Sequence, residues 1–264
     1  MTKKNMSLLK ENKRGQLTIF IIVAILIVVS IVIFFFYVKP TFIAPNGNQL
    51  KIQTCLEDAV KTSVDDLASK GGTNNPKFSY QYMGEKIPYL CYTNLYYRPC
   101  VVQTPFLKQS FEAELTVIAK QKLDLCYDSA IEDLKARGYD IYQTGRNFTI
   151  SLEPGRIIAT LNAPVTISRE SSQRYSEFKT QINSPIYDML MIATSIIQYE
   201  TRLGNADTDS LRTYYPNLMI QKMRQGDETK VYIIQDKQSK TKYQFATRSY
   251  AWPPGYGVDS NLAY

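Results

Sequence analysis

One stretch limits the possible folds of this chain more than any other: the 22 residues from Leu17 to Val38 contain no charged side chain. An α-helix rises about 1.5 Å per residue, so this stretch would reach roughly 33 Å as a helix, enough to cross a hydrocarbon core of about 30 Å. The alternative is a core helix of a soluble domain, but such a helix is rarely apolar on every face for so long. We therefore expect a transmembrane helix over residues 16–38.

The charges beside this stretch predict its orientation. Residues 1–15 contain five Lys and Arg against Glu11 alone, and one further basic residue, Lys39, follows the stretch. Positive flanks favour the cytoplasmic side, so the basic head is expected inside and the large C-terminal part outside. A discarded secretory signal is disfavoured, because the stretch is too long and ends in FFFYVKP instead of a small-residue cleavage site.

The chain has a formal net charge of +7, yet the excess is concentrated in the head. From Pro40 onward, 25 Lys and Arg face 23 Asp and Glu. A basic flank of this kind is typical of a membrane segment, whereas a nucleic-acid-binding domain would carry the excess in its folded part. We expect membrane lipid as a partner and no nucleic acid.

All four cysteines, Cys55, Cys91, Cys100 and Cys126, follow the apolar stretch. An even number in a translocated domain predicts two disulfides, although four cysteines allow three pairings. We expect Cys91 to pair with Cys100 across a short loop, and Cys55 to pair with Cys126 between two helices. A zinc site is the alternative, but the sequence has no CxxC pair and no histidine.

After the apolar stretch, residues 39–49 contain two prolines and a glycine and are expected to form a linker. Apolar residues then recur at helical spacing from Leu50 to Leu67, before the Gly71-Gly72 stop signal. A second helix is expected from Leu107 to Leu125, with Cys126 at its end. The apolar positions of this second helix are Leu107, Phe111, Leu115, Ile118 and Leu125.

Alternating patterns predict strands in the rest of the exposed part. They comprise a tyrosine-rich hairpin around the tripeptide GEK, an antiparallel meander over residues 139–182, and strands in NLMIQKMRQ, TKVYIIQD and KYQFATRSY. Between the last two groups, Ser184 as N-cap, Pro185 at the first helical position and Gly204 as stop signal indicate a helix. The sequence predicts one extracellular α+β domain over residues 50–250, with an antiparallel sheet packed against helices and stapled by disulfides, and an extended tail over residues 251–264.

Catalytic chemistry has few candidates. Without histidine, the usual nucleophile-and-base arrangements are missing, and disulfide-bonded cysteines cannot act as thiolates. Asp124, Asp128 and Glu132 would share one helical face, which is typical of a solvated surface. We expect a protein that is not an enzyme and that needs no cofactor.

The stretch NADTDS begins like a calcium loop, with Asn205, Asp207 and Asp209 at alternating positions. Position six is Ser210 instead of glycine, and position twelve is Pro216 instead of glutamate. We interpret it as a turn and expect no metal there.

Three further features bear on recognition. Asn147-Phe148-Thr149 is an N-glycosylation sequon on the expected outer side. The 20 tyrosines are amphipathic and suit a sugar- or partner-binding face, although half-buried tyrosines of ordinary strands are the alternative. Trp252-Pro253-Pro254 is either an extended ligand for a neighbouring subunit or a segment that lies on its own domain.

The start of the chain, KRGQLTIF, combines a basic pair, Gly-Gln and a hydroxyl residue ahead of the apolar stretch. It resembles the class III signal peptide of archaeal type IV pilin-like proteins. The resemblance implies cleavage by a prepilin peptidase between Gly15 and Gln16, with the apolar helix kept in the mature subunit. Phe20 stands where many pilins have glutamate, and Pro40 and Pro45 would interrupt a long shaft helix.

The exposed part, with TCLEDAVKTSVDDLASKGG, the tyrosine hairpin and LDLCYDS, resembles uncharacterised single-pass surface proteins of small-genome archaea that share a KKGQ-type start. This resemblance implies location in the cell membrane, with the C-terminal domain outside.

Our first hypothesis is a membrane-anchored, pilin-like protein with a structural, assembly or adhesion role, including self-association or contact with other envelope proteins. The alternatives are an anchored domain that binds another envelope component without forming a filament, and an envelope hydrolase that uses carboxylates such as Asp124 and Asp128.

Overall fold

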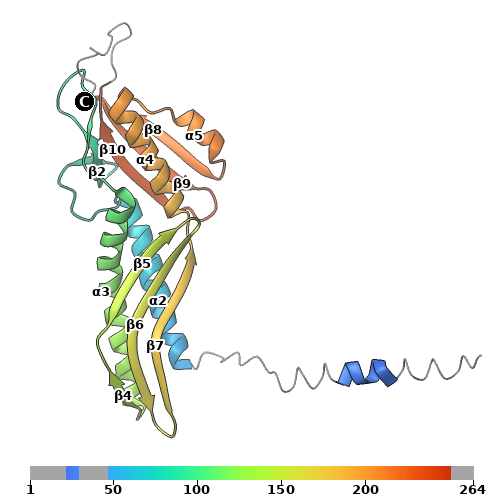
Figure 1. Ribbon diagram of the computed structural model, residues 1–264. Helices are drawn as coiled ribbons and strands as arrows, with labels where there is room; N and C mark the ends of the chain where they lie inside the picture. The colour runs from blue at the N-terminus through green and yellow to red at the C-terminus, as the bar shows by residue number, and fades with distance from the viewer. Residues whose placement is uncertain (1–21, 30–46, 251–264) are drawn as a thin grey trace, which may run out of the picture. The chain divides into compact units, whose positions relative to one another are not determined.

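The computed structural model describes residues 22–29 and 47–250 (Figure 1), with side chains from Lys51 onward in the second range. The chain divides into two units, Met1–Asn46 and Gly47–Tyr264. In the first unit, residues 22–29 are helical and their side chains are exposed. No helix within the described ranges is both long enough and apolar enough to cross a bilayer. The flanks of the expected membrane helix, 16–21 and 30–38, lie outside the described residues.

The second unit is an α+β fold, as predicted, with helices packed on two sheets. Its helices are α2 (Gly47–Ser69), α3 (Leu107–Ala136), α4 (Ile186–Leu203) and α5 (Thr208–Tyr214). One buried core runs through the helices and both sheets. The expected extracellular domain is therefore one folded unit within the described residues.

Helices α2 and α3 pack side by side along much of their length (Figure 1). The apolar spacing of α2 buries Leu56, Val60 and Leu67 completely, because positions three and four apart share one helical face. The helix stops where the sequence predicted, since the N–H of Gly72 donates to the carbonyl of Leu67 at 2.9 Å and both glycines have positive φ.

Helix α3 is longer than expected. It continues ten residues beyond Cys126 to Ala136, and Leu125, predicted to be buried, is 76% exposed. Its buried stripe follows a four-residue spacing that includes a small and a polar-tipped side chain. The stripe is Leu107, Phe111, Leu115, Ala119, Leu123, Tyr127, Ala130, Ile131 and Leu134. The sequence prediction counted only large apolar residues, so it did not recognise Ala119 and Tyr127 as part of the buried face of α3.

The predicted meander is a four-stranded antiparallel sheet. Its strands are β4 (Asp140–Gln143), β5 (Asn147–Glu153), β6 (Arg156–Ser168) and β7 (Ser172–Asn183). Strands β4 and β5 pair with successive parts of β6, and β7 pairs with β6 along its length. Alternate residues of β6 are buried, including Ile157, Ala159 and Leu161, so one face packs on the helices.

The remaining strands form a second, six-stranded sheet in the order β1-β2-β10-β9-β8, with β3 also paired to β2. They are β1 (Ser79–Tyr82), β2 (Glu85–Tyr92), β3 (Val101–Val102), β8 (Leu218–Arg224), β9 (Thr229–Asp236) and β10 (Lys242–Arg248). The pair β2 and β10 is parallel, so this second sheet is mixed, whereas the β4–β7 sheet is the antiparallel sheet expected from the sequence. Strands β2 and β10 lie far apart in the chain, and no local sequence pattern predicts that they pair.

The boundaries of several elements differ slightly from the prediction. Helix α2 begins at Gly47, inside the expected linker, and α4 begins at Ile186, whose N–H donates to Oγ of Ser184 at 3.4 Å. Gly204 ends α4 in the left-handed conformation, as expected. The hairpin turn is Met83-Gly84, because both residues have positive φ, and the rest of the GEK tripeptide belongs to β2.

Candidate functional site

The Cys91–Cys100 disulfide closes a loop between β2 and β3, with Cα atoms 5.3 Å apart. The Cys55–Cys126 disulfide joins α2 to α3, with Cα atoms 5.8 Å apart. These are the two pairs expected from the sequence. Because every cysteine is oxidised, the chain has neither a free thiol nor an imidazole for metal binding or nucleophilic attack.

Aromatic rings gather between the β1–β2 hairpin and the Cys91–Cys100 loop. We call the set Phe78, Tyr92, Tyr96, Tyr97 and Tyr250 the aromatic surface. Phe78 stacks on Tyr92 with centroids 5.6 Å apart, and Tyr96 packs on Tyr250 at 4.9 Å. Phe78, Tyr96 and Tyr97 remain 51%, 70% and 58% exposed. Phe78 and Tyr96 are thus exposed rings held by a neighbouring ring, and such rings suit recognition of a partner at low entropic cost.

Arg248 connects the two ring pairs of this surface. Its guanidinium lies over the rings of Tyr92 and Tyr250, at 5.9 and 5.1 Å from the centroids. The same group donates to the backbone carbonyls of Thr93 and Asp227, at 2.6 and 3.1 Å. The planar cation thereby links the end of β2, the start of the Cys91–Cys100 loop and the β8–β9 turn to the end of β10.

Tyr89 supports the hairpin behind the aromatic surface. Its hydroxyl shares a 2.8 Å hydrogen bond with Oγ1 of Thr229, and its ring meets that of Tyr92 edge to face at 4.9 Å. Burial raises the pKa of the Tyr89 hydroxyl above its usual value. Tyr89 is therefore a neutral packing residue with a satisfied polar tip.

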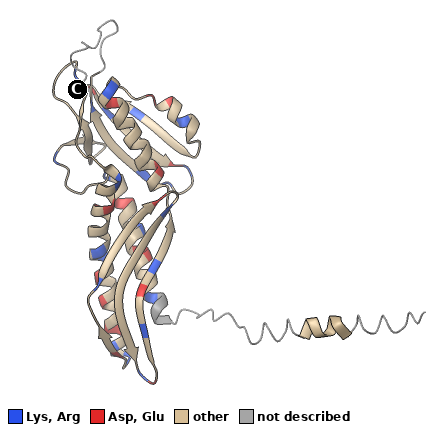
Figure 2. Ribbon diagram, in the orientation of Figure 1, with Lys and Arg blue, Asp and Glu red and all other residues tan. Residues whose placement is uncertain are grey.

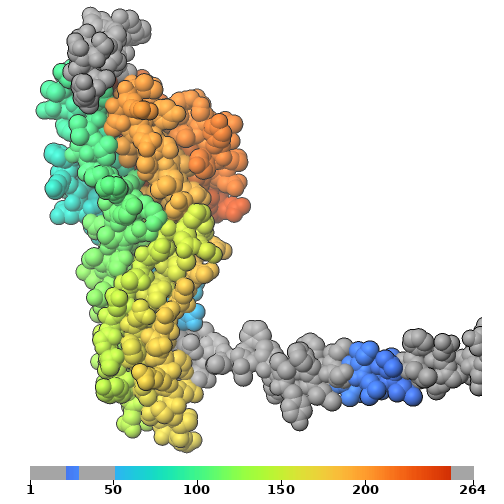
Figure 3. All heavy atoms as spheres, viewed as in Figure 1, coloured from blue at the N-terminus to red at the C-terminus, as the bar shows by residue number. Residues whose placement is uncertain are grey.

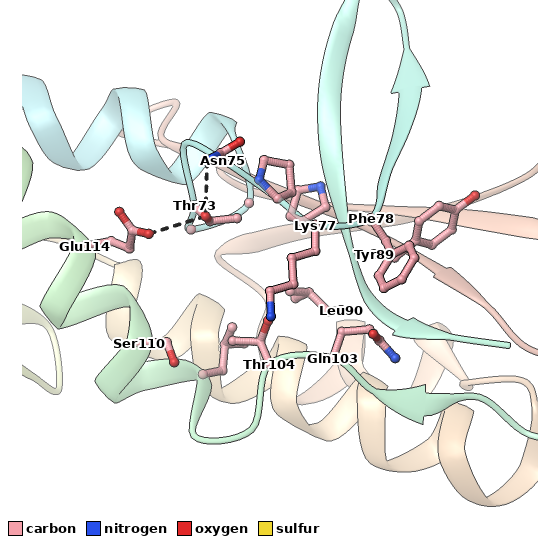
Figure 4. A pocket seen from close by; sticks show the side chains of 15 residues that line it. Thr73, Asn75, Lys77, Phe78, Tyr89, Leu90, Gln103, Thr104, Ser110 and Glu114 are labelled. Carbon is pink, nitrogen blue, oxygen red and sulfur yellow. Dashed lines mark hydrogen bonds between the residues drawn. The ribbon is translucent and has the colours of Figure 1, made fainter.

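A cavity of about 290 Å³ lies next to the hairpin, between the turn after α2 and the start of α3. Figure 4 shows Lys77 extending toward Thr104, with Ser110 and Glu114 on α3. Thr73 lies in the turn after α2 and donates a 3.4 Å hydrogen bond to Glu114. The cavity thus offers one ammonium group, one carboxylate and several hydroxyls. Such a hollow can hold a small polar ligand through hydrogen bonds.

The wall of this cavity is built by the glycines that end α2. The carbonyl of Gly71 accepts a 3.1 Å hydrogen bond from the buried hydroxyl of Tyr243. A Cβ atom at Gly71 would lie 2.5 Å from the carbonyl oxygen of Gln244 and from the ring of Pro88. Only glycine lets the turn pass this close to the sheet at φ +68°.

The acidic row expected on α3 lies at the surface. Arg146 pairs with Asp124 at 3.4 Å and with Asp128 at 2.9 Å, and its guanidinium stacks over the ring of Tyr127 at 4.8 Å. The Asp124 and Asp128 side chains are 35% and 53% exposed, and Glu132 is exposed. The two aspartates therefore form a solvated ion-pair group with Arg146.

The first half of the NADTDS stretch, residues 205–207, connects α4 to α5 and agrees with its interpretation as a turn, whereas Thr208 to Ser210 begin α5. Asp207 caps α5, because its carboxylate accepts a hydrogen bond from the N–H of Asp209 at 3.0 Å. Hydrogen bonds from Ser210 and Asp209 lower the pKa of Asp207. Among the described residues, no three His, Cys, Asp or Glu side chains come together as metal ligands would.

The sequon residue Asn147 begins β5, and both Asn147 and Thr149 are exposed, whereas Phe148 between them is buried. The two polar side chains therefore point away from the core on one face of the strand. The expected processing positions, Gly15 and Gln16, lie outside the described residues, as does the tail over residues 251–264.

Sequence reasoning missed a buried polar group beneath the α4–α5 connection. Lys230 donates to the carboxylate of Glu200 at 2.6 Å and to the carbonyls of Gly204 and Ser249, at 2.6 and 2.9 Å. The hydroxyl of Tyr232 donates to the other Glu200 oxygen. Every donor of this ammonium has a partner, so the group acts as a structural link between α4, β9 and the end of β10.

Charged side chains elsewhere are spread over the folded unit in both signs (Figure 2). Figure 3 shows the segment after the hairpin, drawn in green, against the orange spheres of α4, which contacts β2 and β3. No family model, curated protein or solved structure matches this chain.

Proposed function

We propose that the protein is a non-enzymatic, single-pass membrane protein of the cell surface, with residues 16–38 in the membrane and the α+β domain outside. The observation that carries this proposal is the pair of disulfides, Cys55–Cys126 and Cys91–Cys100, in the part that follows the basic-flanked apolar stretch. Structural disulfides are typical of oxidising compartments outside the cytosol. The five basic residues before the stretch support the same orientation.

Labelling of single cysteines in cells tests the orientation. Ser7→Cys places a thiol in the basic head, and Ser176→Cys places one on the exposed side of β7. A membrane-impermeant maleimide should label Ser176→Cys in intact cells. It should label Ser7→Cys only after lysis, in a Gly15→Leu variant that keeps residues 1–15. The reverse pattern, or recovery of the protein outside the membrane fraction, would contradict the proposal.

We further propose a pilin-like role in assembly or adhesion, with cleavage after Gly15. The support is the KRGQLTIF start together with an α2 helix that begins soon after the apolar stretch. Mass spectrometry of the native protein should find Gln16 as the first residue, and Gly15→Leu should block the cut. Asn12→Ala is the matched control, since it lies near the cut but outside the motif. An intact Met1 terminus would exclude processing and leave the anchor untouched.

A second candidate function is an anchored binding domain that forms no filament. It is favoured by the aromatic surface and by the neighbouring cavity with Lys77 and Glu114, which offer rings and polar groups close together. Electron microscopy of purified appendages separates the two candidates, because absence of this chain from every fibre would favour the binding domain. Tyr97→Ala should weaken binding in that case, while Tyr142→Ala, an exposed tyrosine on β4, should not.

The hydrolase alternative requires carboxylates gathered in a cleft. Asp124 and Asp128 instead share Arg146 at the protein surface. This arrangement does not favour a hydrolase.

A further inference from the structure

The chain leaves β10 along the Cys91–Cys100 loop. The N–H of Thr93 donates to the carbonyl of Arg248 at 3.0 Å, and the N–H of Cys100 donates to Oγ of Ser249 at 3.0 Å. The N–H of Tyr250 then donates to the carbonyl of Arg98 at 3.4 Å. Three successive residues, Arg248, Ser249 and Tyr250, are thus bonded to the loop immediately before the tail begins.

The loop presents apolar side chains at this point. Leu95, Tyr96, Tyr97 and Val101 are 57%, 70%, 58% and 67% exposed. The disulfide holds both ends of the loop in buried positions, so these side chains cannot withdraw into the core together. Adjacent exposed apolar residues of this kind mark an interaction site on a soluble face.

The segment that follows has matching chemistry. Residues 251–264 read AWPPGYGVDSNLAY, with one acidic residue and no basic one. Pro253 and Pro254 lack N–H groups and favour polyproline II, which docks on aromatic surfaces at low entropic cost. At about 3.1 Å per residue, Trp252 lies within roughly 6 Å of the Tyr250 position along the chain. The ring of Tyr96 already packs on Tyr250.

We propose that the tail of the same chain docks on this loop, with Trp252-Pro253-Pro254 against Leu95, Tyr96 and Tyr97. Docking within one chain is favoured over docking between copies, because the bonds at Thr93, Cys100 and Tyr250 deliver the segment to the surface at high effective concentration. This inference does not depend on the membrane location proposed above.

Trp252 is the only tryptophan of the chain, so its fluorescence reports docking without an added label. In the purified full-length protein we expect blue-shifted emission and at least twofold slower acrylamide quenching than for N-acetyltryptophanamide. Leu95→Ser/Tyr97→Ser should remove this protection, whereas Tyr142→Ala, on a different sheet, should keep it. Pro253→Gly/Pro254→Gly leaves the folded unit unchanged and should also weaken docking.

Circular dichroism of each variant separates loss of docking from loss of folding. Emission and quenching that match the free compound in the unmodified protein would overturn the proposal. So would protection that survives Leu95→Ser/Tyr97→Ser. Protection that disappears on hundredfold dilution would overturn docking within one chain and assign the tail to the loop of a second copy.

Discussion

The ammonium group of Lys230 lies 2.6 Å from the carboxylate of Glu200, with the two side chains 4% and 0% exposed. Removing two charges from water costs free energy. The Coulomb attraction within a buried ion pair offsets this cost only if the remaining hydrogen-bonding groups of both side chains also have partners. Both groups meet this condition, because Ala206, Gly204, Ser249 and Tyr232 supply the other partners.

Lys230→Met should lower the free energy of unfolding by about 3–5 kcal/mol, since it leaves the Glu200 carboxylate buried without its counter-charge. The double variant Glu200→Gln/Lys230→Met should cost less than the sum of the single changes. Urea denaturation measures both. Lys70→Met is the control, because its partner Asp66 is 45% exposed and the loss should stay below about 1 kcal/mol. Equal losses for Lys230→Met and Lys70→Met would contradict the structural role.

Buried tyrosines make the fold sensitive to alkali. Burial raises the pKa of Tyr243, and burial together with the Glu200 carboxylate raises that of Tyr232. Above a pH of about 10, the pKa of an unfolded tyrosine, the unfolded chain loses these protons while the folded chain keeps them. The free energy of unfolding should therefore be insensitive to these groups below pH 10 and should fall above it, by up to about 1.4 kcal/mol per pH unit for each tyrosine.

Tyr243→Phe should reduce this alkaline slope, even though the variant also loses the hydrogen bond to Gly71. Tyr142→Phe should leave the slope unchanged, because this ring is 72% exposed. Denaturation curves at several alkaline pH values give the slopes. A Tyr243→Phe slope equal to that of the unmodified protein would show that Tyr243 ionises in the folded state.

The two disulfides should differ in their contribution to stability. Cys55–Cys126 spans 71 residues and Cys91–Cys100 spans nine, so the chain-entropy model gives about 4.4 and about 2.6 kcal/mol. Cys55→Ala/Cys126→Ala should therefore lower the free energy of unfolding by about 2 kcal/mol more than Cys91→Ala/Cys100→Ala. Urea denaturation of the two double variants checks the order, and a reversed order would contradict it.

Gly71 and Gly84 provide a matched pair of turn positions. Both have positive φ, but a Cβ atom at Gly84 meets nothing within 4 Å, whereas one at Gly71 meets the backbone of Gln244 at 2.5 Å. Gly84→Ala should lower the free energy of unfolding by about 1–2 kcal/mol through backbone strain alone. Gly71→Ala should cost about 1–3 kcal/mol more through overpacking. Similar thermal midpoints for both variants would mean that the turn after α2 can shift away from the sheet.

Asn147 is expected to carry a glycan when the protein is made in a host that glycosylates its exported proteins. Asn147→Gln and Thr149→Val should each remove the added mass seen by mass spectrometry. Because both side chains are exposed, the free energy of unfolding of each variant should differ by less than about 0.5 kcal/mol from that of the unmodified protein. An unmodified peptide containing Asn147 from such a host would exclude the modification.

Helices and strands that depend on the spacing of neighbouring residues could be predicted from the sequence. The apolar spacing before Gly71, the alternation along β6 and the stop at Gly204 each predicted an element that the structure contains. The cysteine pairing could also be predicted, because Cys55 lies beside the apolar face of its helix and Cys91 and Cys100 flank a short loop.

Contacts between distant segments were not predictable in this way. Strand β2 pairs with β10 across more than 150 residues, and Glu200 meets Lys230 only because α4 packs on the sheet in which β9 lies beside β10. The same holds for the candidate site. Twenty tyrosines suggested a recognition face, but which of them gather around Arg248 depends on that parallel pairing.

The position of Cys55 has a mechanical consequence for a domain tethered through its N-terminus. Tension from the tether would enter the fold at Gly47 and begin to unwind α2 from that end. Unwinding could release only the residues before Cys55, because the bond to Cys126 then passes the load directly to α3. The residues enclosed between these two cysteines, including the turn at Gly71 and the hairpin, would lie outside the path of the force.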